Sequence, residues 1–214
     1  MFFFGSCVAN AQHTTVSADK MNILYAAIDN PLTIVSENCP CNKLIVKSNL
    51  GSITSDGSCQ FLFKSSESGG AEISVYKKND KGLKKLNTWF FRVKNIPNPV
   101  FRIGPYGGES CYRVYSAVIA AQEFVRADLE NFDFDVRFHV DSFRVNILNN
   151  DSCRIKRFTV NNNHVPNEVR EEFTKLKESD FIVVNKIYAT GPDGLSRHLD
   201  PLTLTIEKNV FKRE

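Results

Sequence analysis

The chain has 214 residues, which is enough for one large or two small domains and too few for a large multidomain enzyme. Lysine and arginine total 27 against 24 aspartate and glutamate, and these charges are scattered singly, which argues against a nucleic-acid-binding stripe. The apolar fraction of 42% and the 17 phenylalanines suffice for a buried core, so the chain is expected to fold. The sequence contains no apolar run of about 18 residues that could span a membrane.

Residues 1–11 are similar to the end of a secretory signal peptide. A short apolar run is followed by Ala-Asn-Ala at residues 9–11, the small-x-small pattern that fits the narrow subsites of signal peptidase. This pattern predicts cleavage before Gln12 and export to the periplasm. The first basic residue is Lys20, so the positively charged start of such a signal is missing, and we expect the start of the sequence to be truncated or misplaced.

Two other interpretations of the N-terminus remain open. The sequence Phe-Gly-Ser-Cys at residues 4–7 could carry a lipid on Cys7, although lipoprotein sites usually have Leu where Phe4 stands. The third interpretation is an N-terminus that is simply disordered. Plain cleavage is the prediction that we adopt.

Short alternating or β-branched runs separated by turn residues characterise the first half of the chain. The expected strands lie at residues 44–46, 61–63, 73–76 and 89–93, and the expected turns lie at residues 55–57, 68–70 and 80–82. This half shows no helical periodicity. Turns at such short intervals are typical of a sandwich, so residues 16–95 are predicted to form an immunoglobulin-like β-sandwich.

Five cysteines remain once residues 1–11 are removed, and they divide between the two halves of the chain. In an oxidising compartment we expect one disulfide in each half, joining Cys59 to either Cys39 or Cys41, and Cys111 to Cys153. The fifth thiol then stays free or pairs between chains. A zinc site is not predicted, because the Cys-x-Cys pair has neither a second pair nor a nearby His.

Residues 95–99, Asn-Ile-Pro-Asn-Pro, are predicted to link the halves, because two prolines hold the chain extended. Beyond this linker, the spacing of apolar residues predicts two helices and several strands. The helices are expected at residues 113–125 and 166–177, the strands at residues 181–184 and 202–206, and a turn at residues 192–194. Residues 99–214 are therefore predicted to form an α+β domain.

The clearest alternation in the chain covers residues 132–147. Aromatic and aliphatic residues alternate with polar ones as far as Asp141, where the apolar positions shift by one residue. Such a slip inside a continuing strand predicts a β-bulge or a bend at Asp141 and Ser142.

The patterns that could carry chemistry are incomplete. Residues 108–112, Gly-Glu-Ser-Cys-Tyr, begin like a nucleophile elbow but lack its closing Gly. The polar residues at 133, 135, 137, 139 and 141 could form a cation or acid–base cluster, yet Arg137 would repel a cation, so a solvated face is expected. The Trp-Phe-Phe run at residues 89–91 could stack on a sugar, although an aromatic residue on a strand is more often core. We predict no enzymatic activity, no cofactor and no metal site.

Five stretches stand in the same order as in one known family: residues 16–25 (VSADKMNILY), 29–31 (DNP), 91–99 (FRVKNIPNP), 129–135 (LENFDFD) and 189–194 (ATGPDG). Through them the chain resembles the C-terminal part of the GldM/PorM family of Bacteroidetes gliding and type IX secretion proteins. The resemblance runs from residue 16 to about residue 207. It implies the third and fourth periplasmic domains of that family, which are β-rich modules of a dimeric shaft.

In that family the shaft links an inner-membrane motor to a ring of partner proteins under the outer membrane, and it has no enzymatic activity. The resemblance therefore implies a periplasmic homodimer that binds other secretion or gliding proteins, and it assigns no catalytic or partner-binding residue. Family members begin with a transmembrane helix and two further domains, which do not precede Val16 here. We expect either a fragment or a separately exported paralogue. The alternative function is a secreted immunoglobulin-like adhesin or carbohydrate-binding module.

Overall fold

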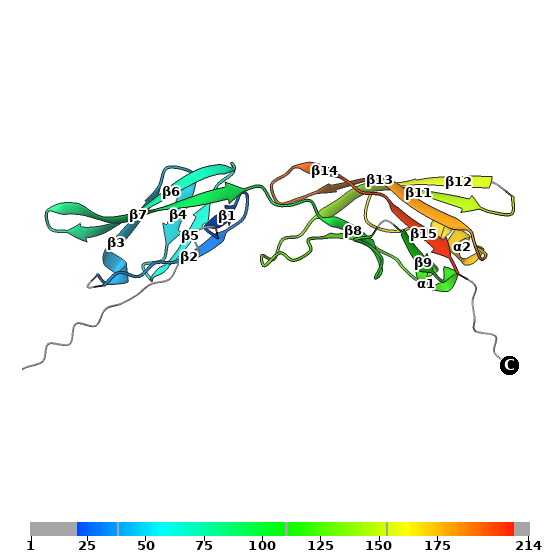
Figure 1. Cartoon of the computed structure of the whole chain (residues 1–214), viewed down its shortest axis with the longest axis horizontal. Coiled ribbons are helices and arrows are strands. Elements are labelled where there is room, and N and C mark those ends of the chain that lie inside the picture. The colour runs from blue at the N-terminus through cyan, green and yellow to red at the C-terminus, as the bar shows by residue number, and fades with distance from the viewer. Residues whose placement is uncertain (1–20, 38, 110, 153, 208–214) are drawn as a thin grey trace, which may run out of the picture.

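The computed structural model describes residues 21–207 apart from Asn38, Ser110 and Cys153. The predictions about Gln12 and Cys7, and the last residues of the predicted second domain, 208–214, lie outside the described residues. The described chain is mainly β, with 54% strand and 9% helix. It forms two lobes that are joined end to end through residues 95–99 (Figure 1).

The first lobe is a β-sandwich of two sheets with the strand orders β1-β7-β6-β3 and β2-β5-β4 (Figure 1). Its elements are β1 (Ile23–Tyr25), β2 (Asn30–Thr33), the 3-10 turn η1 (Cys41–Lys43), β3 (Leu44–Ser48), β4 (Ser52–Ser55), β5 (Gln60–Lys64), β6 (Gly69–Asn79) and β7 (Gly82–Lys94). Because side chains alternate along a strand, Phe63 of β5 and Ile73 of β6 point inward and are buried between the sheets. The predicted β-sandwich is confirmed.

The second lobe is built on a six-stranded sheet with the order β12-β11-β13-β15-β9 and with β14 paired to β13. Its elements are β8 (Val100–Ile103), β9 (Cys111–Val114), α1 (Ser116–Ala120), β10 (Val125–Asp128), β11 (His139–Asn149), β12 (Arg154–Val160), α2 (Asn167–Thr174), β13 (Phe181–Thr190), β14 (Ser196–Leu199) and β15 (Leu202–Ile206). Its hydrophobic core, which includes Phe143, Phe173 and Ile182, contains no residue of the first lobe. The predicted α+β fold with two helices is confirmed.

The alternating segment 132–147 is a strand only in its second part. β11 begins at His139, and residues 132–138 are assigned to no strand. The predicted slip is confirmed, because the pairing of β11 with β13 shifts register on both sides of Ser142. The strand predicted over residues 132–138 was wrong, because Phe132 and Phe134 contact the first lobe instead of forming part of a sheet.

Two further local predictions need correction. The first helix is shorter than residues 113–125, because β9 pairs in parallel with β15 as far as Val114, and α1 starts at Ser116. The turn predicted at residues 68–70 is displaced, since Gly69 already opens β6 opposite Val93. In both places pairing with a distant strand decides the conformation over local preference.

Candidate functional site

The junction between the lobes begins with Tyr25, the last residue of β1, whose backbone is fixed by a buried amide. Asn30 is 1% exposed, and its Oδ1 accepts a hydrogen bond from the Tyr25 N–H at 2.7 Å. The Nδ2 of Asn30 donates to the Tyr25 carbonyl at 2.8 Å and to the Phe63 carbonyl at 3.3 Å. The turn from β1 to β2 therefore holds Tyr25 in one position at the end of the sandwich.

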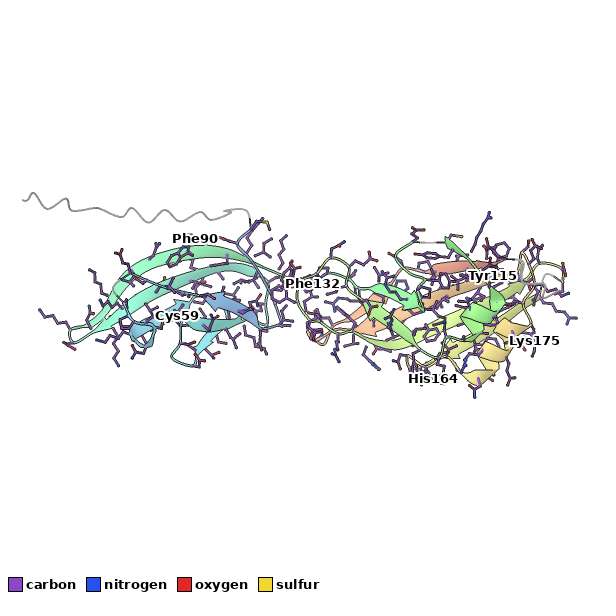
Figure 2. The ribbon with its side chains drawn as sticks, turned by 90° about the horizontal axis from the view of Figure 1, so that it is seen from below. Cys59, Phe90, Tyr115, Phe132, His164 and Lys175 are labelled. Carbon is purple, nitrogen blue, oxygen red and sulfur yellow. A yellow bond between two sulfur atoms is a disulfide. The ribbon has the colours of Figure 1, made fainter. Side chains whose placement is uncertain are left out.

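Three aromatic rings connect the two lobes. The Tyr25 ring meets the Phe132 ring at 4.7 Å between centroids and the Phe134 ring at 5.5 Å, both edge to face. Phe132 lies between the two lobes in Figure 2, and its ring is 5.5 Å from that of Phe134. Contacts of this geometry contribute about 0.5 to 1.5 kcal/mol each beyond the area they bury. The period-two alternation predicted the apolar side of this segment correctly, but Phe132 and Phe134 on that side face the other lobe, whereas Phe138 packs against the core of the second lobe.

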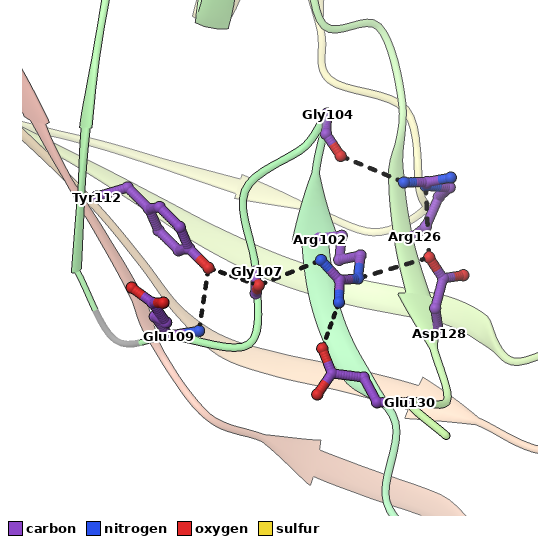
Figure 3. Close-up of polar contacts among 8 residues, drawn as sticks. All are labelled: Arg102, Gly104, Gly107, Glu109, Tyr112, Arg126, Asp128 and Glu130. Atoms are coloured by element: carbon purple, nitrogen blue, oxygen red, sulfur yellow. Dashed lines mark hydrogen bonds and ion pairs between the residues drawn. The ribbon is translucent and has the colours of Figure 1, made fainter. Parts of the chain in front are cut away.

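An arginine network holds the segment at its start, as Figure 3 shows. Arg102 of β8 forms an ion pair with Glu130, and its Nη1 donates to the Gly107 carbonyl at 3.2 Å. The hydroxyl of Tyr112 donates to the same carbonyl at 2.6 Å and accepts from the Glu109 N–H at 3.2 Å. The segment carrying Phe132 is therefore anchored to β8 and to the loop that follows it.

A second ion pair holds the segment at its end. The Arg197 guanidinium lies 5.0 Å from the centre of the Phe138 ring and pairs with Asp193, and the side chains of Arg197 and Asp193 are only 9% and 12% exposed. Hydrogen bonds from Arg197 hold the pKa of Asp193 below its ordinary value of 3.8. A Cβ on Gly191 would stand 2.7 Å from the Phe138 ring, so this close approach requires glycine.

The stretches on which the family resemblance rests all contribute to this junction. Tyr25 and Asn30 come from the first two stretches, and the linker stretch supplies Ile96, which is buried. The stretch at residues 129–135 supplies the two phenylalanines, and the stretch at residues 189–194 supplies Asp193 and Gly191. Sequence patterns carry no signal for this convergence, because the residues lie up to 168 positions apart, from Tyr25 to Asp193, and meet through tertiary packing.

The residues whose sequence patterns suggested catalysis or metal binding form hydrogen bonds or ion pairs within the fold. In the incomplete elbow, Glu109 and Tyr112 belong to the loop network described above, and Ser110 lies outside the described residues. Asp135 and Arg137 are exposed and 3.8 Å apart, whereas Asp141 accepts a hydrogen bond from the Thr190 hydroxyl at 2.7 Å. Within the described residues no cluster of three or more His, Cys, Asp or Glu side chains could hold a metal ion.

In the first lobe a disulfide joins Cys41 of η1 to Cys59, which immediately precedes β5, with 4.9 Å between their Cα atoms. Of the two candidate partners for Cys59, the structure therefore pairs Cys41, and Cys39 is a buried free thiol. The bond fastens η1 to the turn between β4 and β5.

The predicted bridge between Cys111 and Cys153 is not supported by the residues around it. Cys111 is an exposed free thiol that opens β9, whereas Arg154, the neighbour of Cys153, opens β12 at the opposite edge of the same sheet. Four strand spacings of about 4.8 Å separate these edges, and bridged cysteines need Cα atoms within about 7 Å. Cys153 itself lies outside the described residues, so the pairing stays a prediction.

The aromatic run at residues 89–91 does not present one platform for a sugar ring. Trp89 pairs with Ile73 of β6, and Phe91 pairs with Ala71, so both point to the inner face of the sheet, whereas Phe90 points to the outer face. Trp89 and Phe91 line a groove in which Thr33 is the one side chain with a hydroxyl. This lining offers few partners for the hydroxyl groups of a carbohydrate.

Comparison with known families identifies both lobes. A family model described as the GldM third domain matches residues 13–94, and one described as the GldM C-terminal domain matches residues 97–207. The chain belongs to the GldM family. Proteins of this family are components of gliding motility and type IX secretion, and the resemblance inferred from the five stretches is confirmed.

The other comparisons add little to this assignment. The search of curated proteins gave no match. Among solved structures, the chain is similar to the adhesin InvE of Yersinia pseudotuberculosis, with 13% sequence identity and a TM-score of 0.26, covering 87% of this chain. The chain spans 56% of that adhesin chain. None of the helices in the described part of the chain is long and apolar enough to cross a membrane.

Proposed function

We propose that this GldM-family chain is a non-enzymatic scaffold that binds other polypeptides in the periplasm, as part of a gliding or type IX secretion apparatus. The observation that carries the proposal is the junction, where the five family stretches join two β-rich lobes end to end. A strut needs a fixed angle between its modules, and the three-ring contact between Tyr25, Phe132 and Phe134 supplies one.

Deletion of the gene tests this function in a strain that carries the apparatus. We expect type IX cargo to accumulate inside the cells, and a plasmid copy of the chain to restore its release. Normal release of cargo and normal gliding after deletion would argue for a function outside the apparatus.

Export to the periplasm is a separate part of the proposal. The pattern at residues 9–11 predicts a mature protein that begins at Gln12. N-terminal sequencing of the protein recovered from the periplasm tests this. A mature chain that begins at an acylated Cys7 would support lipid anchoring instead.

We also propose that the scaffold is a two-fold homodimer, because closed two-fold pairs are the commonest assemblies of identical chains. The second lobe offers β12, an edge strand of its sheet on which Ile155 is exposed. The mass of the full chain in solution, measured by light scattering, should be twice the 24.2 kDa of one chain. A monomer at all concentrations would remove the dimer from the proposal and leave the scaffold role standing.

A further inference from the structure

The outer side of β7 is an open strand edge over most of its length. β6 pairs with β7 from Gly82 to Val93, whereas on the other side β1 pairs only with Arg92–Lys94. Among the described residues no strand covers residues 82–91 on that side. The Phe90 carbonyl points outward there and accepts a hydrogen bond from the Asn22 side chain at 3.3 Å. Unpaired N–H and C=O groups of this kind pair readily with another chain.

An apolar groove runs beside this edge, between the two sheets of the sandwich. It has a volume of about 260 Å³ and is lined by Leu32, Thr33, Ile34, Val35, Ile73, Trp89 and Phe91. Trp89 is 41% exposed at its mouth, which is unusual for the largest apolar side chain of the lobe. Alternate side chains of a strand added to β7 would enter the groove, since every second residue of a strand points to the same face.

The hairpin between β6 and β7 concentrates positive charge next to the open edge. Five lysines, Lys77, Lys78, Lys81, Lys84 and Lys85, stand at its tip, where Asp80 is the single acidic residue between residues 77 and 85. All five lie between residues 77 and 85 of the sequence, and the pairing of β6 with β7 brings the two ends of this run together. Like charges that stand close together repel, so a negatively charged partner would stabilise a hairpin tip that carries Lys78, Lys81, Lys84 and Lys85.

Four of these lysines form no ion pair with the described residues. Lys78, Lys81, Lys84 and Lys85 form no ion pair with any carboxylate in the described part of the molecule. Lys43 adds a further positive charge beside the hairpin tip. The tip forms the end of the first lobe that lies farthest from the second lobe (Figure 1), so a partner reaches it without disturbing the junction.

We propose that the open edge of β7 binds an extended, acidic segment of a partner protein by strand addition. Its backbone pairs with residues 82–91, alternate apolar side chains enter the groove at Trp89, and its carboxylates meet the hairpin lysines. This inference rests on the scaffold function proposed above and gives it a binding surface and a partner chemistry. A second copy of the same edge is a poor occupant, because it offers Lys84 and Lys85 and no carboxylate to the hairpin lysines.

Trp89 is the single tryptophan of the chain, so its fluorescence reports directly on the groove. The probe is a synthetic peptide of about ten residues in which valine alternates with glutamate, titrated into the full-length chain. We expect the Trp89 emission to shift to shorter wavelength as the peptide excludes water from the groove. The affinity should fall when salt is raised from about 50 mM to about 500 mM.

Backbone pairing is tested on the peptide, where no variant can fail to fold. Two versions carry N-methyl groups on alternate residues, one on the odd set and one on the even set. Only one edge of an added strand faces β7, so strand addition predicts that one version loses binding and the other keeps it. A peptide with lysine in place of glutamate should not bind.

A charge variant tests the hairpin and has a matched control in the second lobe. The double variant Lys84→Glu and Lys85→Glu should weaken peptide binding by about tenfold or more. The double variant Arg113→Glu and Lys186→Glu makes the same change of charge in the second lobe, on β9 and β13, and should leave the affinity unchanged. All four side chains are exposed, so neither variant should disturb the fold.

Five results would overturn the proposal. Binding of both N-methylated peptides would exclude backbone pairing, and equal binding of the lysine peptide would exclude charge recognition. A Trp89 response that appears only after residues 1–20 are deleted would show that the chain covers its own edge. An equal response to anionic phospholipid vesicles, lost in the same Lys84 and Lys85 variant, would assign the surface to a membrane. If peptide binding fails while the deletion strain still loses secretion, the surface is wrong and the scaffold function stands.

Discussion

At the scale of single residues, two buried polar side chains support the aromatic contact between the lobes. Asn30 satisfies both the N–H and the carbonyl of Tyr25 from one turn away, and Arg197 covers the Phe138 ring while it pairs with Asp193. A buried polar group that loses its partner costs more than the hydrogen bond was worth. Substitutions of these residues should therefore have larger effects than the number of atoms removed suggests.

Replacing Asn30 with alanine should destabilise the first lobe by about 1 to 3 kcal/mol, because it leaves the partly buried Tyr25 N–H without this acceptor. Urea unfolding followed by Trp89 fluorescence measures the change. Asn98→Ala is the control, since Asn98 is exposed in the linker, and it should change stability by less than about 0.5 kcal/mol. Equal effects of the two substitutions would contradict the role given to Asn30.

The ion pair of Asp193 predicts a dependence of stability on pH. The pKa of Asp193 is lower in the folded chain than its ordinary value of 3.8, so the unfolded chain binds the proton first. The stabilisation is therefore complete above about pH 5 and is lost as the pH falls below 3.8 towards the folded pKa. Urea unfolding of the second lobe by circular dichroism, at about pH 5 and about pH 3, should show a smaller difference for Asp193→Asn than for the wild type. Asp133→Asn, an exposed carboxylate, should keep the full difference.

At the scale of elements, the sequence predicted conformation wherever a strand or helix depends on its own pattern. The alternation of residues 61–63 predicted β5, and the phase shift at Asp141 predicted the bulge beside Ser142. The prediction of a strand failed at residues 132–138, because alternation shows which side of a segment is apolar and does not show what that side packs against. The open edge of β7 was not predictable for the same reason, since pairing is decided between distant segments.

Tyr25→Ala should loosen the junction without unfolding either lobe. It removes two edge-to-face contacts, together worth about 1 to 3 kcal/mol. In ¹⁵N relaxation measurements the wild-type lobes should tumble together, and the lobes of the variant should tumble faster and independently. Phe124→Ala is the matched control, because the Phe124 ring makes one such contact with the His164 ring, at 5.2 Å between centroids, and His164 lies well away from Phe132 in Figure 2. Unchanged tumbling in the Tyr25 variant would show that the rings do not set the angle.

The disulfide between Cys41 and Cys59 should stabilise the first lobe mainly by restricting the unfolded chain. It spans 18 positions in the sequence, and a closed loop of that size contributes about 3 kcal/mol. The double variant Cys41→Ala and Cys59→Ala should lower the stability measured by urea unfolding by this amount, whereas Cys111→Ala, at an exposed thiol, should not. If reduction of the wild-type protein leaves its unfolding midpoint unchanged, the disulfide contributes nothing to the stability of the first lobe.

At the scale of the whole molecule, the chain is an elongated pair of β-rich lobes (Figure 1). Each lobe has its own core, and the contact between them comes from one end of each. The β6–β7 hairpin is thereby placed at one extreme of the molecule and the β11–β12 hairpin near the other, as Figure 1 shows. Such a shape suits a strut that holds partners apart, and it leaves the strand edges at both ends open to them.

Capture of partners by the full-length chain tests the scaffold function most directly. The tagged chain is expressed at its native level, cross-linked in living cells, and recovered from the periplasm for mass spectrometry. We predict that gliding or type IX secretion proteins are enriched over a control strain that exports an unrelated tagged β-sandwich. Recovery of the chain with none of these proteins enriched would contradict the account.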